Sequence, residues 1–132
     1  MLDTNICIYL MKHQPPEVRA RFQACYVGDV VISAITLAEL EYGVASSEGS
    51  RVAHNQSVLN RLLEEIRVAP FDEGCARTYG PLRASNRARN KDALDKLIAA
   101  HAMALRVTLV THNVAEYKNY KDLCIENWVN PH

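Results

Sequence analysis

The sequence lacks long apolar runs, and its charge has no excess of one sign. None of its apolar stretches approaches the roughly 18–20 residues of a membrane-spanning helix, so we expect no membrane span. No basic stretch followed by an apolar one opens the chain, so we expect no signal peptide either. Lys and Arg total 15, Asp and Glu total 15, and the formal net charge is zero with neutral histidines. This balance excludes a domain that holds nucleic acid by bulk positive charge, although it leaves room for a local basic patch.

Cysteine is scarce as well, and its spacing carries no metal-binding pattern. The four cysteines are Cys7, Cys25, Cys75 and Cys124, and no two of them form a Cys-X-X-Cys pair. A zinc site is therefore not predicted. A chain of 132 residues fits one domain, residues 1–132, and buries a core without covalent staples. We expect reduced, mostly buried thiols in a cytoplasmic protein.

Short apolar runs alternate with helical patterns along the chain. We expect strands at residues 1–2, 30–32, 66–69, 107–110 and 123–125. We expect helices at residues 5–13, 17–25, 34–45, 52–65, 72–87 and 93–105, with a short helix or turn at 113–117. Strands separated by helices form mostly parallel sheets, so the pattern predicts an α/β domain.

Local signals refine the expected helices. Thr4 or Asn5 is expected to cap the first helix, and Ser33 the helix at 34–45. The first strand, at only two residues, suggests that the natural chain starts upstream of Met1 or has a trimmed terminus. In the helix at 93–105 the expected buried stripe consists of Leu94, Leu97, Ile98, His101 and Leu105.

Polar residues follow two of the expected strands. Asp3 comes directly after the first strand, and Asn113 and Glu116 follow the strand at 107–110. In open parallel sheets, ligands bind at the carboxyl ends of strands where the strand order switches, so these residues are candidates for a shared site. Each has a structural explanation too, because helix starts favour acids and amides.

Three further acids lie in expected helices. Glu39 and Glu41 both have apolar neighbours one turn away, and helical periodicity does not choose between them. Asp95 begins the helix at 93–105, where Asp92 and Asp95 also match the two ends of a capping box. Clusters of carboxylate oxygens bind Mg²⁺ or Mn²⁺. Such ions polarise phosphoryl oxygens and generate hydroxide, so a phosphodiester is the substrate that fits.

Four segments, in this order, resemble the motifs of PIN-domain nucleases. They are residues 1–6 (MLDTNI), 33–43 (SAITLAELEYG), 95–102 (DKLIAAHA) and 109–117 (LVTHNVAEY). Order and spacing match over essentially the whole chain, and within the family the sequence is most similar to the VapC toxins of bacterial toxin–antitoxin pairs. The resemblance implies a three-layer α/β/α fold with a mostly parallel sheet of about five strands. It further implies an endoribonuclease that depends on Mg²⁺ or Mn²⁺, with tRNA as the favoured substrate, a homodimer, and inhibition by a VapB-type antitoxin.

The resemblance also assigns residues. Matched motif to motif, the catalytic acids are Asp3, Glu39 and Asp95, with Asp3 and Asp95 holding the principal ion. Glu39 is preferred to Glu41 because it holds the family position four residues before Gly43. The supporting residues would be Asn5, Thr111, Asn113 and Glu116, and either of the last two would complete the site through water.

The sequence departs from the family at one point, because Asp92 and Ala93 stand where many relatives carry an Ile-Gly pair. We leave Asp92 out of the catalytic set.

The segment from residue 83 to residue 96 is locally basic. Its cations are predicted to contact the RNA backbone, although a solvated helix end would look the same. They are Arg83, Arg87, Arg89, Lys91 and Lys96.

Two other functions fit the same pattern less well. A non-catalytic PIN-fold binding module would not need the three acids. A phosphoryl-transfer or receiver-type domain would need a Gly-rich phosphate loop, or a lysine after a late strand, and the sequence has neither.

Overall fold

The domain is built on a short parallel sheet with the N-terminal residues at its centre. The computed structural model describes residues 1–26, 28–86 and 93–130. Strand β1 (Val31–Ser33) pairs with β2 (Arg67–Ala69), and β3 (Leu109–Val110) pairs with β4 (Ile125–Glu126). Leu2 joins the two pairs, because it bridges Ile32 on one side and Val110 on the other, again in parallel. The order is therefore β2-β1-Leu2-β3-β4, which confirms the predicted parallel arrangement.

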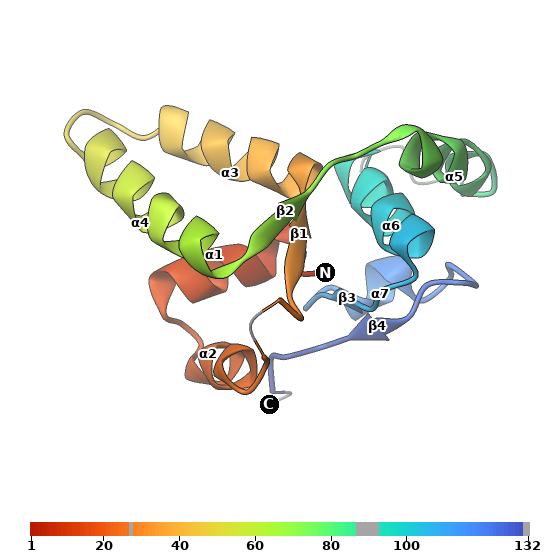
Figure 1. Cartoon of the computed structure of the whole chain (residues 1–132), viewed down its shortest axis with the longest axis horizontal. Helices are drawn as coiled ribbons and strands as arrows, with labels where there is room; N and C mark the ends of the chain where they lie inside the picture. Colours follow the sequence, from red (N-terminus) through yellow and green to blue (C-terminus); the bar gives the residue numbers. More distant parts are fainter. Residues whose placement is uncertain (27, 87–92, 131–132) are drawn as a thin grey trace.

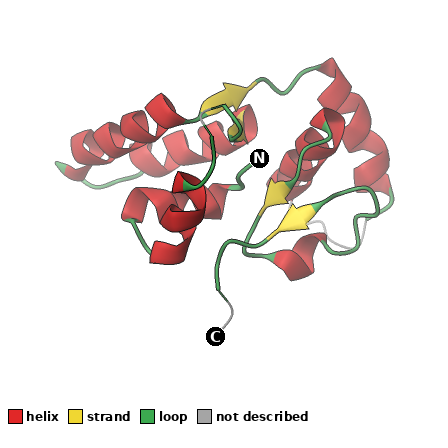
Figure 2. Ribbon diagram, turned by 60° about the horizontal axis from the view of Figure 1, so that its bottom comes forward, coloured by secondary structure: helices red, strands yellow, loops and turns green. Residues whose placement is uncertain are grey.

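Seven helices are described around this sheet (Figures 1 and 2). They are α1 (Thr4–Lys12), α2 (Pro16–Gln23), α3 (Ala34–Ala45), α4 (Arg51–Glu65), α5 (Glu73–Ala84), α6 (Ala93–Leu105) and α7 (Val114–Tyr117). The predicted bounds of α3 and α6 are reproduced exactly. Helix α5 ends earlier than predicted, at Ala84, with Ser85 as its C-cap. Strand β3 is shorter than the predicted 107–110, and β4 lies nearer the C-terminus than the predicted 123–125.

The central strands supply side chains to a hydrophobic core on each face of the sheet. Leu2, Ile32 and Val110 belong to one core with α1 and α4, whereas Met1 and Leu109 belong to the other with α6. This alternation is the two-residue period of an extended strand buried on both faces. It produces three layers, with helices α1 to α4 and helices α5 to α7 gathered on opposite sides of the strands in Figure 1.

The N-cap predicted for α1 is wrong, and the buried stripe predicted for α6 is wrong at Leu94 and Leu105. The N-cap of α1 is Asp3, not Thr4 or Asn5, because the Asp3 carboxylate accepts a hydrogen bond of 3.0 Å from the Ile6 N–H. In α6, Leu94 and Leu105 are 49% and 42% exposed. Ile98 and His101 are buried as predicted, and the rest of the buried surface of α6 is rich in alanine, whose small side chain lets neighbouring elements approach closely. The predicted cap at Ser33 is confirmed, since its hydroxyl accepts from the Ile35 N–H.

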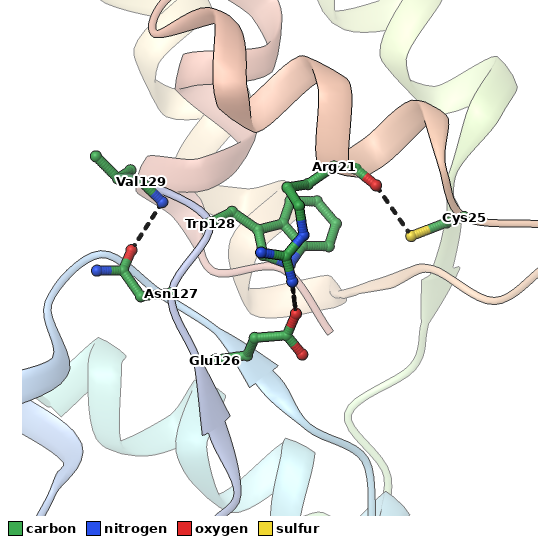
Figure 3. A network of polar contacts seen from close by, with 6 residues as sticks. All are labelled: Arg21, Cys25, Glu126, Asn127, Trp128 and Val129. Carbon is green, nitrogen blue, oxygen red and sulfur yellow. Dashed lines mark hydrogen bonds and ion pairs between the residues drawn. The ribbon is translucent and has the colours of Figure 1, made fainter. Parts of the chain in front are cut away.

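The segment after β4 is held against α2 (Figure 3). The Trp128 indole N–H donates to Glu126 Oε1 at 3.0 Å, and the Arg21 guanidinium forms an ion pair with the same carboxylate. Arg21 also lies 5.8 Å from the centre of the Trp128 ring. These contacts fasten the last strand of the sheet to a helix from the first quarter of the chain.

The thiols agree with the absence of a disulfide framework. All four cysteines are free; Cys7 and Cys75 are buried, Cys25 is half-buried and Cys124 is exposed. Within the described ranges, no helix is long and apolar enough to cross a membrane.

Candidate active site

Asp3 lies where the strand order of the sheet switches direction. The chain leaves Leu2, forms β1 on one side of it, and returns later to form β3 on the other side. Asp3 directly follows Leu2, and its N–H donates to the Val110 carbonyl at 3.0 Å. The carboxyl end of the central strand at such a switch is the usual ligand site of parallel sheets.

The Asp3 carboxylate is held tightly in a buried position. It is only 5% exposed, caps α1 through the Ile6 N–H, and is hydrogen-bonded to the Thr111 side chain. Burial raises the pKa of Asp3, and the negative charge of Glu39 raises it further, against the lowering effect of the two hydrogen bonds. An ionised carboxylate in this place is therefore stabilised by any cation that joins it.

Glu39 is oriented toward the start of α1 by Thr4. The Thr4 hydroxyl donates to Glu39 Oε1 at 2.6 Å, and lies 3.4 Å from the Thr36 hydroxyl. Glu39 is half-buried whereas Glu41 is exposed, so the structure separates two acids that periodicity left equivalent. Sequence analysis missed Thr4 as a partner of Glu39. Its neighbour Asn5, predicted to support the site, is exposed.

Asp95 meets a side chain that sequence analysis also missed. Asp95 is half-buried in the first turn of α6, and its charge acts on the buried hydroxyl of Tyr117. Burial raises the pKa of Tyr117, and the charges of Asp95 and Asp3 raise it further. One buried hydroxyl therefore lies within electrostatic reach of both acids.

The other predicted supporting residues surround the end of β3. Thr111 is fully buried, and its hydroxyl accepts from the Asn113 N–H at 3.0 Å. Asn113 itself is exposed and makes no side-chain cap with α7, whereas Glu116 in α7 is half-buried. Among these residues, the Thr111 side chain is hydrogen-bonded to the candidate acid Asp3.

The donor set is compatible with a magnesium ion. No three His, Cys, Asp or Glu side chains in the described part of the chain are arranged to share one metal. Mg²⁺ is usually held by only one or two carboxylates, because it keeps several of its waters. Asp3 and Asp95 offer oxygen donors of this kind, and Glu39 lies close enough to affect the pKa of Asp3.

The predicted basic residues separate into three groups. Arg83 is exposed at the end of α5, where its Nη1 donates to the Tyr79 hydroxyl at 2.8 Å. Lys96 is 1% exposed, and its Nζ donates to the Asn86 carbonyl at 3.1 Å. This hydrogen bond connects α6 to the residues that follow α5. Because a buried ammonium is not accessible to a phosphate, we withdraw the prediction that Lys96 contacts RNA. Arg87, Arg89 and Lys91 lie outside the described residues, as does Asp92.

A family model and solved relatives agree with this geometry. The PIN domain matches residues 1–121, so the chain belongs to the PIN-domain family. Ribonuclease VapC2 of Rickettsia felis is 38% identical over 133 residues, covering 97% of this chain and 96% of that protein. The tRNA(fMet)-specific endonuclease VapC of Shigella flexneri is 35% identical, with coverage of 97% and 96%. Within the PIN-domain family, the chain is therefore a member of the VapC ribonucleases.

The similarity extends to three dimensions. The crystal structure of VapBC2 from Rickettsia felis, bound to a DNA fragment from their promoter, matches with a TM-score of 0.88 and 36% identity, covering 98% of each chain. DNA-bound VapBC from Salmonella typhimurium gives a TM-score of 0.88 at 32% identity, covering 98% of this chain and 97% of that one. The fold is thus the PIN fold, and the receiver-type alternative is set aside.

Proposed function

We propose that this protein is a metal-dependent endoribonuclease toxin that cleaves tRNA and is neutralised by a VapB-type antitoxin. The observation that supports the proposal is the buried Asp3 carboxylate at the switch point of a PIN-family sheet, where the charge of Glu39 acts on it and where the charges of Asp3 and Asp95 both act on the Tyr117 hydroxyl. The relatives named above supply the substrate class, since one of them is a tRNA(fMet)-specific endonuclease.

The proposed roles follow from where each acid lies. Asp3 and Asp95 hold the divalent cation, because Asp3 is buried at the sheet edge and the charges of both acids act on the hydroxyl of Tyr117. Glu39, less buried and fixed by Thr4, accepts the proton of the attacking water. A bound Mg²⁺ or Mn²⁺ would polarise the phosphoryl oxygens and lower the pKa of water at the site.

Cleavage of purified tRNA is the direct test. The protein is incubated with total tRNA in Mg²⁺ or in EDTA, and the cut is mapped on the RNA. We expect cleavage only with the metal, and we expect Asp3→Asn and Asp95→Asn to fold but lose it. If both variants cleave in Mg²⁺ as the unchanged protein does, the assignment of these acids is wrong.

Cations of the segment that begins at Arg83 are proposed to hold the RNA backbone next to the acids. Arg83 is exposed at the end of α5, and Arg87 and Arg89 follow it in sequence. Each phosphate contact releases counterions, so the Arg87→Ala, Arg89→Ala double variant should bind RNA more weakly and with a flatter salt dependence. Equal salt slopes for the variant and the unchanged protein would remove these two residues from the proposed interface.

The antitoxin is proposed to occupy the groove beside Glu39. This groove, of about 550 Å³, lies between α1, α3 and α4, and its apolar lining includes Ile8, Met11, Leu40 and Val58. VapC structures similar to this chain are VapBC complexes, and an apolar groove that ends at an active-site acid suits a segment that also blocks the acid. Co-expression with the cognate VapB-type antitoxin should yield a complex that Val58→Glu prevents. The predicted homodimer and cytoplasmic location stay predictions.

A further inference from the structure

Thr4 joins the start of α1 to the middle of α3 at the proposed general base. Its hydroxyl donates to Glu39 Oε1 at 2.6 Å, across 35 residues of chain. This length is typical of a hydroxyl that donates to an ionised carboxylate, and such a bond is about twice as strong as one between neutral groups. Thr4 is half-buried, so water competes only partly for the contact.

The Thr4 hydroxyl has no capping function in its own helix. The N-cap of α1 is Asp3, whose carboxylate accepts from the Ile6 N–H at 3.0 Å. Thr4 is the first residue of α1, and threonine and valine have similar helix propensities. Both hydrogen bonds that the structure describes for the Thr4 hydroxyl lead to α3. We therefore expect α1 to form without this hydroxyl, and its contact with Glu39 needs another explanation.

A second hydroxyl restricts the direction in which Thr4 donates. Thr36 is fully buried and lies one turn before Glu39 on α3, so both side chains are on the same face of that helix. The hydroxyl oxygens of Thr4 and Thr36 are 3.4 Å apart. A hydroxyl has one proton and two acceptor positions, and we assign the Thr4 proton to the shorter contact, with Glu39. Thr36 then donates to Thr4, and the three side chains form a chain of hydrogen bonds that ends on the Glu39 carboxylate.

We propose that Thr4 is a positioning residue, whose hydroxyl holds the Glu39 carboxylate in the orientation from which it accepts a proton from water. The inference rests on the proposed function, in which Glu39 is the general base. A general base must lie within hydrogen-bond reach of the proton that it removes. Thr4 contacts one oxygen of the carboxylate, so the other oxygen is the one assigned to this proton. Thr4 is assigned no contact with RNA or with the metal, so loss of its hydroxyl slows cleavage without weakening either.

The test compares Thr4→Val, which keeps the shape of the side chain without its hydroxyl, with Thr4→Ser, which keeps the hydroxyl. The kcat and KM for cleavage of total tRNA are measured at saturating Mg²⁺. Mn²⁺ binding to the metal-free protein is measured by isothermal titration calorimetry without RNA. For Thr4→Val we expect kcat to fall about tenfold or more, as for loss of a hydrogen bond to a charged group. We expect KM and the Mn²⁺ dissociation constant to stay within about twofold, and Thr4→Ser to recover most of the lost kcat.

The control removes a threonine hydroxyl from a different helix. Thr78 on α5 donates to the Gly74 carbonyl of its own helix at 3.0 Å, so Thr78→Val makes the same chemical change there. We expect its kcat to stay within about twofold of that of the unchanged protein. An unchanged kcat in Thr4→Val, an equal fall in Thr78→Val, or a serine variant as slow as the valine variant would overturn the inference. A loss that appears in KM or in Mn²⁺ affinity instead of in kcat would do the same.

Glu39→Gln separates this inference from the proposed function. Full cleavage by that variant would refute the role of Glu39 itself. If Glu39→Gln is slow, adding Thr4→Val should reduce kcat little further, because the effects of residues that act as a unit do not add. A further loss of about tenfold in the double variant would show that Thr4 acts through something other than Glu39, and the inference would be wrong.

Discussion

Replacing Asp3 by asparagine separates its two functions, capping a helix and binding a cation. Asparagine caps helices about as well as aspartate, so the Asp3→Asn side chain still accepts from the Ile6 N–H. Thr111 can accept as well as donate a hydrogen bond, so that contact also survives. What the variant loses is the buried negative charge beside Glu39.

The expected stability differs with and without metal. The pKa of Asp3 is raised above 3.8 in the folded state. The contribution of Asp3 to stability is therefore complete when the pH lies below the pKa of Asp3 in the unfolded state. This contribution is lost as the pH rises through the pKa of Asp3 in the folded state. In EDTA at neutral pH, the asparagine variant should thus melt at the same temperature as the unchanged protein or higher. Asp3→Ala, which removes the cap, should lose about 1 kcal/mol, or about 4 °C for a chain of this length.

Binding of Mg²⁺ should reverse the order of thermal stability of the unchanged protein and Asp3→Asn. At a Mg²⁺ concentration of about 100 times the dissociation constant, binding stabilises the unchanged protein by about 2.7 kcal/mol. That corresponds to about 10 °C in melting temperature, and Asp3→Asn should show almost none of this increase. Differential scanning calorimetry of the three proteins in EDTA and in Mg²⁺ measures both effects. The reasoning fails if Mg²⁺ stabilises the asparagine variant as much as the unchanged protein, or if that variant is as unstable in EDTA as Asp3→Ala.

Three further predictions address other contacts. Glu39→Gln should reduce tRNA cleavage at least about 100-fold and the exposed Glu41→Gln should not, so equal rates for the two variants would contradict the choice of Glu39. Burial lowers the pKa of His101 from 6.5, so urea unfolding in EDTA should show a loss of stability as the pH falls below about 6.5. His101→Asn should reduce this loss, and an unchanged pH dependence in that variant would contradict the prediction. Trp128→Ala should lower the free energy of unfolding by about 3–5 kcal/mol because the ring is buried. Arg21→Ala should lower it by less than about 1 kcal/mol because both partners of its ion pair are about half exposed. Equal losses in thermal unfolding would mean that the ion pair, not the ring, holds the C-terminal segment.

Sequence patterns predicted the parts of the fold that depend on local chemistry. Ser33 has a short hydroxyl side chain directly before a helical pattern, and its cap was predictable for that reason. Asp3 has an equally good capping side chain, but its neighbours Thr4 and Asn5 have too, and local propensity does not rank three adjacent candidates. In α6, the apolar periodicity identified the helix and the buried positions Ile98 and His101, but it also predicted burial of Leu94 and Leu105, which are exposed while alanines take their place in the core.

The contacts within the site were less predictable, because they join segments far apart in the chain. Thr4 donates a hydrogen bond to Glu39, which lies 35 residues further along the chain. Tyr117, in the helix after β3, lies within electrostatic reach of Asp95. Each of these hydroxyls lies next to a recognised motif residue, but proximity in sequence does not reveal which acid a side chain faces. Helical periodicity did not choose between Glu39 and Glu41, but the family resemblance did, and the structure agrees with that choice because Glu39 is half-buried and Glu41 is exposed.

The chemistry of these partners bears on why the acids remain available for a cation. A lysine or arginine beside Asp3 would lower its pKa and also compete with the metal for the same oxygens. A threonine or tyrosine hydroxyl orients a carboxylate through one oxygen while adding no charge, so the negative potential at the site persists. In Asp3 this potential is visible as a raised pKa, with burial and Glu39 together outweighing two hydrogen bonds. The buried negative charge therefore destabilises the folded protein in the metal-free state. A divalent cation that binds there removes this destabilisation.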